Sequence, residues 1–205
     1  MKNVKGIWLP DSEVHMVEWI EREGGYQLKK QALAASYVTQ WRCAVDVGAH
    51  CGTWALNLVK RFETVHCFEP IPEHLECLKM NAPKAVIHEV PLGERGEYVS
   101  FRKNPKSTGD ASILPSGKGD TRTAVLDDFN LQNVDFMKLD CEGYEVAVLK
   151  GALRTIIRCR PVIVVEQKPG KGSLFGYGDT EAVSLLESLG AKLRESVSGD
   201  YILSW

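Results

Sequence analysis

The stretch VDVGAHCG at residues 45–52 decides the predicted fold. Apolar residues lead up to Asp46, which predicts that this acid lies at the end of a buried β-strand. Gly48 and Gly52 follow, and neither carries a Cβ that would obstruct a ligand lying against the backbone. A dinucleotide site would have the spacing G-x-G-x-x-G, but here His50 stands at the middle position. Because an acid beside the turn repels phosphate, the pattern favours a nucleoside that carries an amino acid, and S-adenosylmethionine (SAM) is such a molecule.

Outward from this turn, short apolar runs alternate with segments of helical periodicity, a pattern typical of strands and helices that build a parallel sheet. Two strand-like segments at residues 192–195 and 201–205 are joined by Ser198 and Gly199, and they predict an antiparallel C-terminal hairpin. We therefore predict an α/β fold: a Rossmann-like sandwich with a mostly parallel seven-stranded sheet and helices on both faces. The strands predicted to be parallel are residues 43–47, 64–68, 85–90, 134–139 and 161–165.

The connecting helices are predicted from apolar residues at helical spacing. After the fourth strand, one helix is predicted to carry Val146, Leu149, Leu153 and Ile156 on one face. The other predicted helices span residues 12–24, 27–38, 53–62, 72–81 and 180–189.

The chain of 205 residues has the size of a single domain. Residues 1–40 are interpreted as a helical N-terminal cap that shields an edge of the sheet, with a lid over a ligand as the alternative. Residues 41–205 are the predicted Rossmann-like core. Residues 93–122 form a long insertion that includes a predicted hairpin arm at residues 98–101, and insertions of this length are more often functional than decorative.

The composition is that of an ordinary globular protein, with 44% hydrophobic and 25% charged residues. The net charge is -2, and the Lys and Arg residues are scattered, so we expect no nucleic-acid partner. The N-terminus has no apolar signal segment and no stretch approaches about 18 uninterrupted apolar residues, so we expect no membrane association. The six cysteines form no C-x-x-C pair, and reduced thiols in the cytoplasm fit this pattern best.

A second acid, Glu69, stands before Pro70 at the end of the second predicted strand. A carboxylate at this place can accept both ribose hydroxyls of an adenosine. Together with Asp46, which is placed to hold an amino group directly or through water, Glu69 strengthens the prediction of a SAM site. The predicted cofactor-binding residues are Asp46, Gly48, His50, Gly52, Glu69, Pro70 and Asp140.

Three more acids are expected at the same edge, because ligands of open parallel sheets lie beyond the carboxyl ends of the strands. Asp140 and Glu142 follow the fourth strand, and Glu166 ends the fifth. Lys138 within the fourth strand is unusual, since a buried ammonium group needs a partner such as a carboxylate. We predict Asp140, Glu142 and Glu166 as the catalytic residues, which orient or deprotonate an acceptor hydroxyl.

Taken together, these motifs resemble the FkbM family of methyltransferases. The resemblance runs from about residue 44 to residue 168 and more weakly to residue 205, and the block at residues 138–151 is its most specific part. It implies a SAM-dependent O-methyltransferase that acts on a hydroxyl of a sugar or small metabolite. Residues 1–40 do not match the family pattern. The motifs are residues 45–52, 69–70, 92–94, 109–112, 125–129, 138–145, 149–151 and 161–166.

Several alternatives remain open. No metal is predicted, although carboxylates at the ends of the fourth and fifth strands could hold Mg²⁺. An NAD-linked oxidoreductase is disfavoured by the missing middle glycine and by the lack of a Tyr-x-x-x-Lys pair, and a non-catalytic methyltransferase-like binding protein is the other rival. His50 and His88 are interpreted as hydrogen-bonding partners more readily than as bases. Glycine-rich loops at residues 109–119 and 170–178 are predicted as substrate gates, and the oligomeric state is not indicated.

Overall fold

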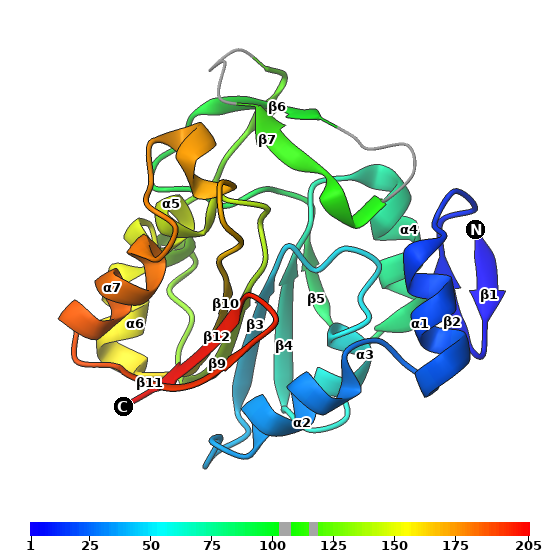
Figure 1. The fold of residues 1–205 in the computed structure, drawn as a ribbon, viewed down its shortest axis with the longest axis horizontal. Helices are drawn as coiled ribbons and strands as arrows, with labels where there is room; N and C mark the ends of the chain where they lie inside the picture. Colours follow the sequence, from blue (N-terminus) through cyan, green and yellow to red (C-terminus); the bar gives the residue numbers. More distant parts are fainter. Residues whose placement is uncertain (103–107, 115–118) are drawn as a thin grey trace.

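The computed structural model describes residues 1–102, 108–114 and 119–205, which form an α/β sandwich around a seven-stranded sheet (Figure 1). The first five strands of the core in chain order pair in parallel, and the last two add an antiparallel hairpin. This arrangement confirms the predicted fold class. From one edge to the other, the strands are β11 (Lys192–Val197), β12 (Asp200–Ser204), β10 (Val162–Glu166), β9 (Val134–Leu139), β3 (Cys43–Val47), β4 (Thr64–Phe68) and β5 (Val86–His88).

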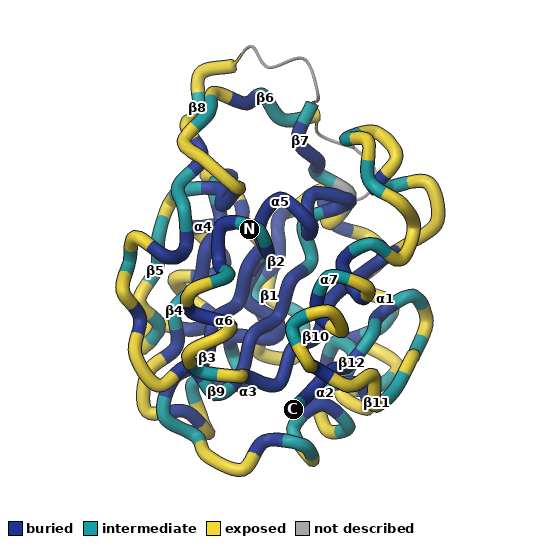
Figure 2. The backbone as a smooth tube through the Cα atoms, turned by 90° about the vertical axis from the view of Figure 1, so that its left-hand side faces the viewer, coloured by how far each residue is buried: buried dark blue, intermediate teal, exposed yellow. Residues whose placement is uncertain are grey.

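Helices cover both faces of this sheet, and alternate residues of each strand supply the two cores. Val45 and Met137 face one core, which also takes in apolar residues of α5 (Glu145–Lys150), α6 (Leu153–Cys159) and α7 (Glu181–Ser188). Ala44 and Phe136 face the other core, with α2 (Leu28–Ala35), α3 (Ala55–Leu58) and α4 (Pro72–Asn81). The two-residue period of a strand explains why neighbouring residues serve opposite faces. Figure 2 shows the central strands as the most buried part of the chain.

The N-terminal segment differs in one respect from the predicted helical cap. It contains α1 (His15–Glu23) and α2, but the chain begins with a hairpin of β1 (Lys2–Val4) and β2 (Ile7–Leu9). Lys5 and Gly6 both have positive φ, which suits a tight two-residue hairpin turn. Asn81 of α4 anchors β2, since its side chain accepts from Trp8 N and donates to Trp8 O, both at 2.8 Å.

The helix predicted after the fourth strand is divided into α5 and α6 at Gly151. A Cβ at this glycine would lie 2.1 Å from the Gly93 carbonyl oxygen, so a loop distant in sequence occupies the space beside the break. Asp127 then caps α6, because its carboxylate accepts from Arg154 N at 2.9 Å and Thr155 N at 2.8 Å. Helical spacing of the apolar residues continues across the break, which is why the sequence predicts one helix.

The insertion forms a three-stranded arm above the carboxyl edge of the main sheet (Figure 1). Its strands are β6 (Tyr98–Arg102), β7 (Ser112–Leu114) and β8 (Thr121–Arg122). The predicted hairpin arm at residues 98–101 corresponds to β6, which pairs antiparallel with two strands, β7 and β8. The predicted gate at residues 109–119 falls partly outside the described residues, at 115–118. Among the helices that the structure describes, none has the length and apolar character needed to cross a bilayer.

Substitution of Gly151 by alanine should destabilise the protein by about 3 kcal/mol or more, because the new methyl group would collide with backbone rather than with a movable side chain. Urea denaturation measures this change. Gly178→Ala is the matched control, since the nearest atom to a Cβ there is Glu181 Oε2 at 3.9 Å, an ordinary van der Waals contact. Equal stability of the two variants would contradict the role given to the Gly93 contact.

Candidate active site

The turn after β3 and the turn after β9 lie against each other at the carboxyl edge of the sheet. Val47 stands opposite Leu139 in the parallel pair, and Asp140 N donates to Val47 O at 3.1 Å. Gly48 has a φ of +72°, and a Cβ there would lie 2.0 Å from the Asp140 carbonyl oxygen. Glycine is required at this close approach. The predicted glycine turn and Asp140 therefore form one continuous wall.

Glu69 is buried at the end of β4 and is held by three hydrogen bonds. Its Oε1 accepts from Ile71 N at 2.9 Å and from His74 Nδ1 at 3.1 Å, and its Oε2 accepts from His50 N at 2.9 Å. Burial opposes ionisation, but the hydrogen bonds from His74 and Ile71 and the nearby histidines hold the pKa of Glu69 below its ordinary value. A carboxylate can accept about four hydrogen bonds, so Oε2 keeps acceptor capacity for a ligand.

A polar bridge joins the N-terminal segment, the arm and the glycine turn. Thr108 Oγ1 donates to the buried Glu13 carboxylate in a short contact, and His50 Nε2 lies 2.9 Å from the same hydroxyl. Burial lowers the pKa of His50 to about 3, so its ring is neutral. Because Thr108 gives its hydroxyl hydrogen to Glu13, the Nε2–H of His50 is the donor to Thr108. His50 therefore acts as a hydrogen-bonding partner here.

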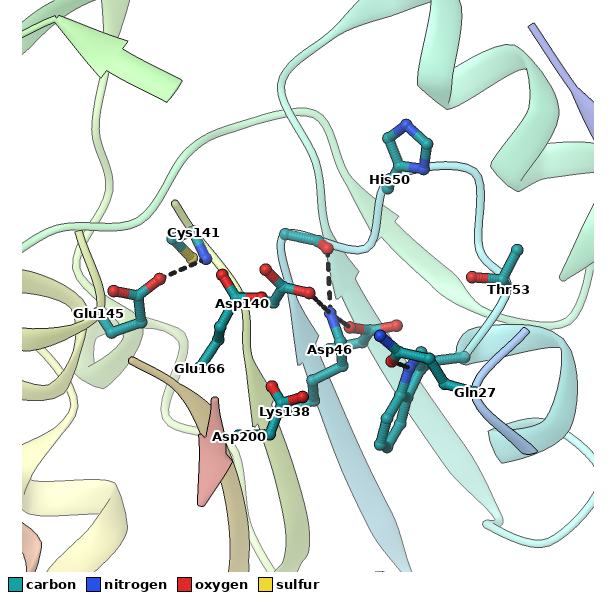
Figure 3. A network of polar contacts seen from close by, with 12 residues as sticks. Gln27, Asp46, His50, Thr53, Lys138, Asp140, Cys141, Glu145, Glu166 and Asp200 are labelled. Atoms are coloured by element: carbon teal, nitrogen blue, oxygen red, sulfur yellow. Dashed lines mark hydrogen bonds and ion pairs between the residues drawn. The ribbon is translucent and has the colours of Figure 1, made fainter. Parts of the chain in front are cut away.

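Lys138 lies between two aspartates at the centre of the site (Figure 3). Its Nζ is 3.5 Å from Asp46 Oδ1, 3.4 Å from Asp140 Oδ2 and 3.3 Å from the Gly48 carbonyl oxygen. Although burial disfavours the ammonium ion, Asp140 and Asp46 raise the pKa of Lys138 above its ordinary value. Burial also raises the pKa of Asp46, whereas Lys138 and Lys168 hold the pKa of Asp140 low despite burial.

The three acids predicted to be catalytic converge, since their carboxylate oxygens lie within 4.8 Å of one another. Each acid also meets a lysine: Asp140 pairs with Lys138, Glu142 makes a short contact with Lys171, and Glu166 lies 2.5 Å from Lys168. Lys171 belongs to the loop at residues 170–178, which brings this predicted gate to the site. The three lysines supply positive charge beside these acids, as an ion such as Mg²⁺ would. That the site binds no metal remains a prediction.

Glu166 and Glu145 have strongly shifted pKa values. Burial raises the pKa of Glu166 to about 7, with a further contribution from Asp140 and opposition from Lys168. Burial likewise raises the pKa of Glu145 to about 7, although its carboxylate accepts from Cys141 N at 2.8 Å, as Figure 3 shows, and from Gly143 N at 3.1 Å. Glu145 thus secures the turn that carries Asp140.

Two cavities meet at this edge of the sheet. The first has about 570 Å³ of empty space and apolar walls that include Phe68 and Leu92. The second has about 1030 Å³ and is more polar, with Tyr26, Trp54 and Lys168 among its walls. The residues that line both cavities, and so mark their junction, are Gly48, His50, Gly109, Asp140 and Glu142.

The predicted site residues divide among these cavities. Glu69 and Pro70 line the first cavity, and Glu166 lines the second. Asp46 and Gly52 line neither: the Asp46 side chain is fully buried beside Lys138, and Gly52 packs against α4, where a Cβ would lie 2.5 Å from Leu78 Cδ1. Neither residue forms part of a wall of these two cavities, and a role of Asp46 or Gly52 in cofactor binding remains a prediction.

Other residues of the site are not among the predicted ones. Glu13, His15, Met16 and Tyr26 of the N-terminal segment line the second cavity. Glu13 also caps α1, since its Oε1 accepts from Met16 N at 2.9 Å. Its position three residues before Met16, at the start of the helix, is the local feature of the sequence that points to Glu13. Its contact with Thr108, 95 residues away, leaves no trace in the local pattern.

The architecture defines the class of protein: a Rossmann-like methyltransferase fold with a cleft beyond the carboxyl ends of its strands. The FkbM methyltransferase domain matches residues 46–193. This chain belongs to the FkbM methyltransferase family.

Solved structures support the fold. A methyltransferase FkbM from Methylobacillus flagellatus KT is 20% identical with a TM-score of 0.54, and the match covers 80% of this chain but 44% of that one. A precorrin-6y C5,15-methyltransferase from Geobacter metallireducens GS-15 is 17% identical with a TM-score of 0.52, covering 100% and 99%. A candidate methyltransferase from Streptococcus mutans, in complex with S-adenosylhomocysteine (SAH), is 8% identical with a TM-score of 0.50, covering 86% and 94%. No curated protein matches the sequence.

The raised pKa of Glu145 makes stability depend on pH. In the folded state this group keeps its proton up to about pH 7, whereas the unfolded chain releases it near 4.5, so stability falls as the pH rises through this window. Glu145→Gln keeps an acceptor for both backbone N–H groups and cannot ionise. We expect the variant to be more stable than the wild type by roughly 1–3 kcal/mol at about pH 8 and to differ little at about pH 5.

Urea denaturation at the two pH values measures the Glu145 effect. Glu166 titrates in the same range and is present in both proteins, and Glu145 is only a minor contributor to its raised pKa, so the difference between variant and wild type reports mainly on Glu145. A difference in stability that is the same at both pH values would rule out titration of Glu145 as its cause.

Proposed function

We propose that the protein is a SAM-dependent methyltransferase that methylates a hydroxyl oxygen of a sugar or small metabolite. The observation that carries this proposal is the junction of two unlike cavities at Gly48, His50 and Asp140. One cavity suits a nucleoside and the other a polar acceptor, and methyl transfer requires that donor and acceptor meet in line with water excluded. The SAH complex of the Streptococcus mutans protein supports SAM as the donor.

The first cavity is the proposed site of the adenosine group. Phe68, Ile71 and Leu92 offer apolar surface for the base, and Glu69 presents a carboxylate to the ribose hydroxyls. The Gly48 turn leaves the backbone open to the ligand, and Asp140 at the junction supplies negative charge for its cationic part. When bound, SAM supplies an electrophilic methyl group on a sulfonium ion.

The second cavity is the proposed acceptor site. Tyr26 and Trp54 provide apolar surface, and the lysines and carboxylates can hydrogen-bond to hydroxyl groups. Of the predicted catalytic acids, Glu166 is best suited to take the hydroxyl proton, because a base works best when its pKa is near the operating pH. Asp140, with its lowered pKa and its Lys138 partner, is better suited to binding than to proton transfer.

A cytoplasmic location and a hydroxylated small-molecule partner are parts of the same proposal. The six cysteines are free thiols, which fits a reducing compartment. The mixed charges of the second cavity fit a polyhydroxylated acceptor.

Calorimetric titration with SAM, SAH and NAD tests the choice of ligand. We expect SAM and SAH to bind and NAD not to bind. Glu69→Gln should weaken binding of both by about tenfold or more, because hydrogen bonds to a charged group are the stronger kind. Glu89→Gln, on an exposed ion pair with Lys79, is the control and should bind like the wild type. Binding of NAD in preference to SAM would overturn the proposal.

Glu166→Gln should slow methyl transfer on the order of 100-fold or more, which is the usual effect of removing a general base. The measurement uses SAM with a labelled methyl group and a panel of sugars and other hydroxylated acceptors, and SAM affinity is measured in parallel. Turnover equal to that of the wild type, with SAM affinity intact, would remove Glu166 from the chemistry. Asp140→Asn and Glu142→Gln in the same assay then decide among the remaining acids.

A further inference from the structure

Asp46 and Lys138 form a buried pair that the proposed chemistry does not yet use. The Asp46 side chain has no solvent exposure, and within the described ranges neither of its oxygens has a hydrogen-bond partner. Its counter-ion is the Lys138 ammonium group, 3.5 Å from Oδ1. Burying an ionised acid is unfavourable in free energy unless a cation lies beside it. Asp46 therefore holds the Lys138 ammonium group in place.

Lys138 transmits this constraint to the ligand site. Its Nζ reaches Asp140 Oδ2 at 3.4 Å and the Gly48 carbonyl oxygen at 3.3 Å, and its side chain lines the second cavity. Asp140 is the more accessible acid, with a side-chain exposure of 28% against 0% for Asp46. Lys138 therefore links the fully buried Asp46 to the more exposed Asp140, and Figure 3 shows its ammonium group between the two carboxylates.

Asp140 lies at the junction of the two cavities, which is where the proposed function puts the sulfonium and the methyl group. We propose that Lys138 is a positioning residue for the methyl donor: by joining Asp46 to Asp140, it holds the Asp140 carboxylate at the junction as a counter-ion for the sulfonium. This inference rests on the proposed function. SAM carries a sulfonium charge that the product SAH has lost, so the held carboxylate favours the donor over the product.

The test compares SAM and SAH affinities with the free energy of unfolding in matched variants. Lys138→Met leaves Asp46 buried without its cation, so this variant should lose both stability and SAM affinity. Combining Lys138→Met with Asp46→Asn removes the lone acid and should recover most of the stability. We expect the double variant still to bind SAM about tenfold more weakly than the wild type, with a smaller change for SAH.

Asp140→Asn provides a second test that does not depend on the buried pair. It removes the proposed counter-ion, so the preference for SAM over SAH should fall as it does in the double variant. The control is the combination Arg42→Met with Asp135→Asn, which removes an ion pair at the amino ends of β3 and β9, whereas the site lies at their carboxyl ends. Neither of these residues lines the two cavities, and SAM affinity should stay within about twofold of the wild type.

The inference is overturned if the double variant is stable and binds SAM and SAH as the wild type does, because Lys138 would then serve only to neutralise Asp46. An unchanged SAM preference in Asp140→Asn would also overturn it. If the wild-type protein binds neither SAM nor SAH, the proposed function fails and this inference fails with it. If the wild type binds both ligands and the variants do not change that binding, the positioning role of Lys138 is refuted and the proposed function still stands.

Discussion

The close approach of the Gly48 turn to the Asp140 backbone is the constraint on which the site depends. It follows from the parallel pairing of β3 with β9, which puts Val47 beside Leu139 and brings both strands to the same edge. A side chain at Gly48 would occupy the place of the Asp140 carbonyl oxygen. With the two turns in contact, Lys138 reaches both aspartates, and the two cavities share a wall instead of opening at separate places.

The electrostatics of this edge are more balanced than a row of acids would suggest. The sequence predicts five carboxylates there, and the structure pairs four of them with lysines: Lys138 with Asp46 and Asp140, Lys168 with Glu166, and Lys171 with Glu142. Lys138 is noticeable in the sequence because it interrupts an apolar strand, whereas the other two lie in loops where a lysine is ordinary. Pairing allows many ionisable groups to be packed together, since an isolated charge in this interior would be neutralised by a shift of its pKa.

Features encoded by local pattern are predictable from the sequence, and features made by distant contacts are not. The strand before Gly48, the acid Glu69 and the C-terminal hairpin each have a signal within a few residues. The break at Gly151 depends on the Gly93 carbonyl oxygen, and the Glu13–Thr108 contact joins residues 95 positions apart. The short β1–β2 hairpin is missed for a related reason, because its pairing is completed by Asn81 of α4.

The second cavity is lined by two parts of the chain, one that matches the FkbM domain and one that precedes the matched region. Asp140, Glu142 and Glu166 lie within residues 46–193, the region that matches the FkbM domain. Glu13, His15 and Tyr26 lie before it and close the same cavity from the other side. Glu13 also fixes the arm through Thr108, and Thr108 contacts His50, which lines both cavities. In the proposed function the shared region supplies the chemistry and the N-terminal segment shapes the acceptor cavity, so acceptor choice should follow that segment rather than the family match.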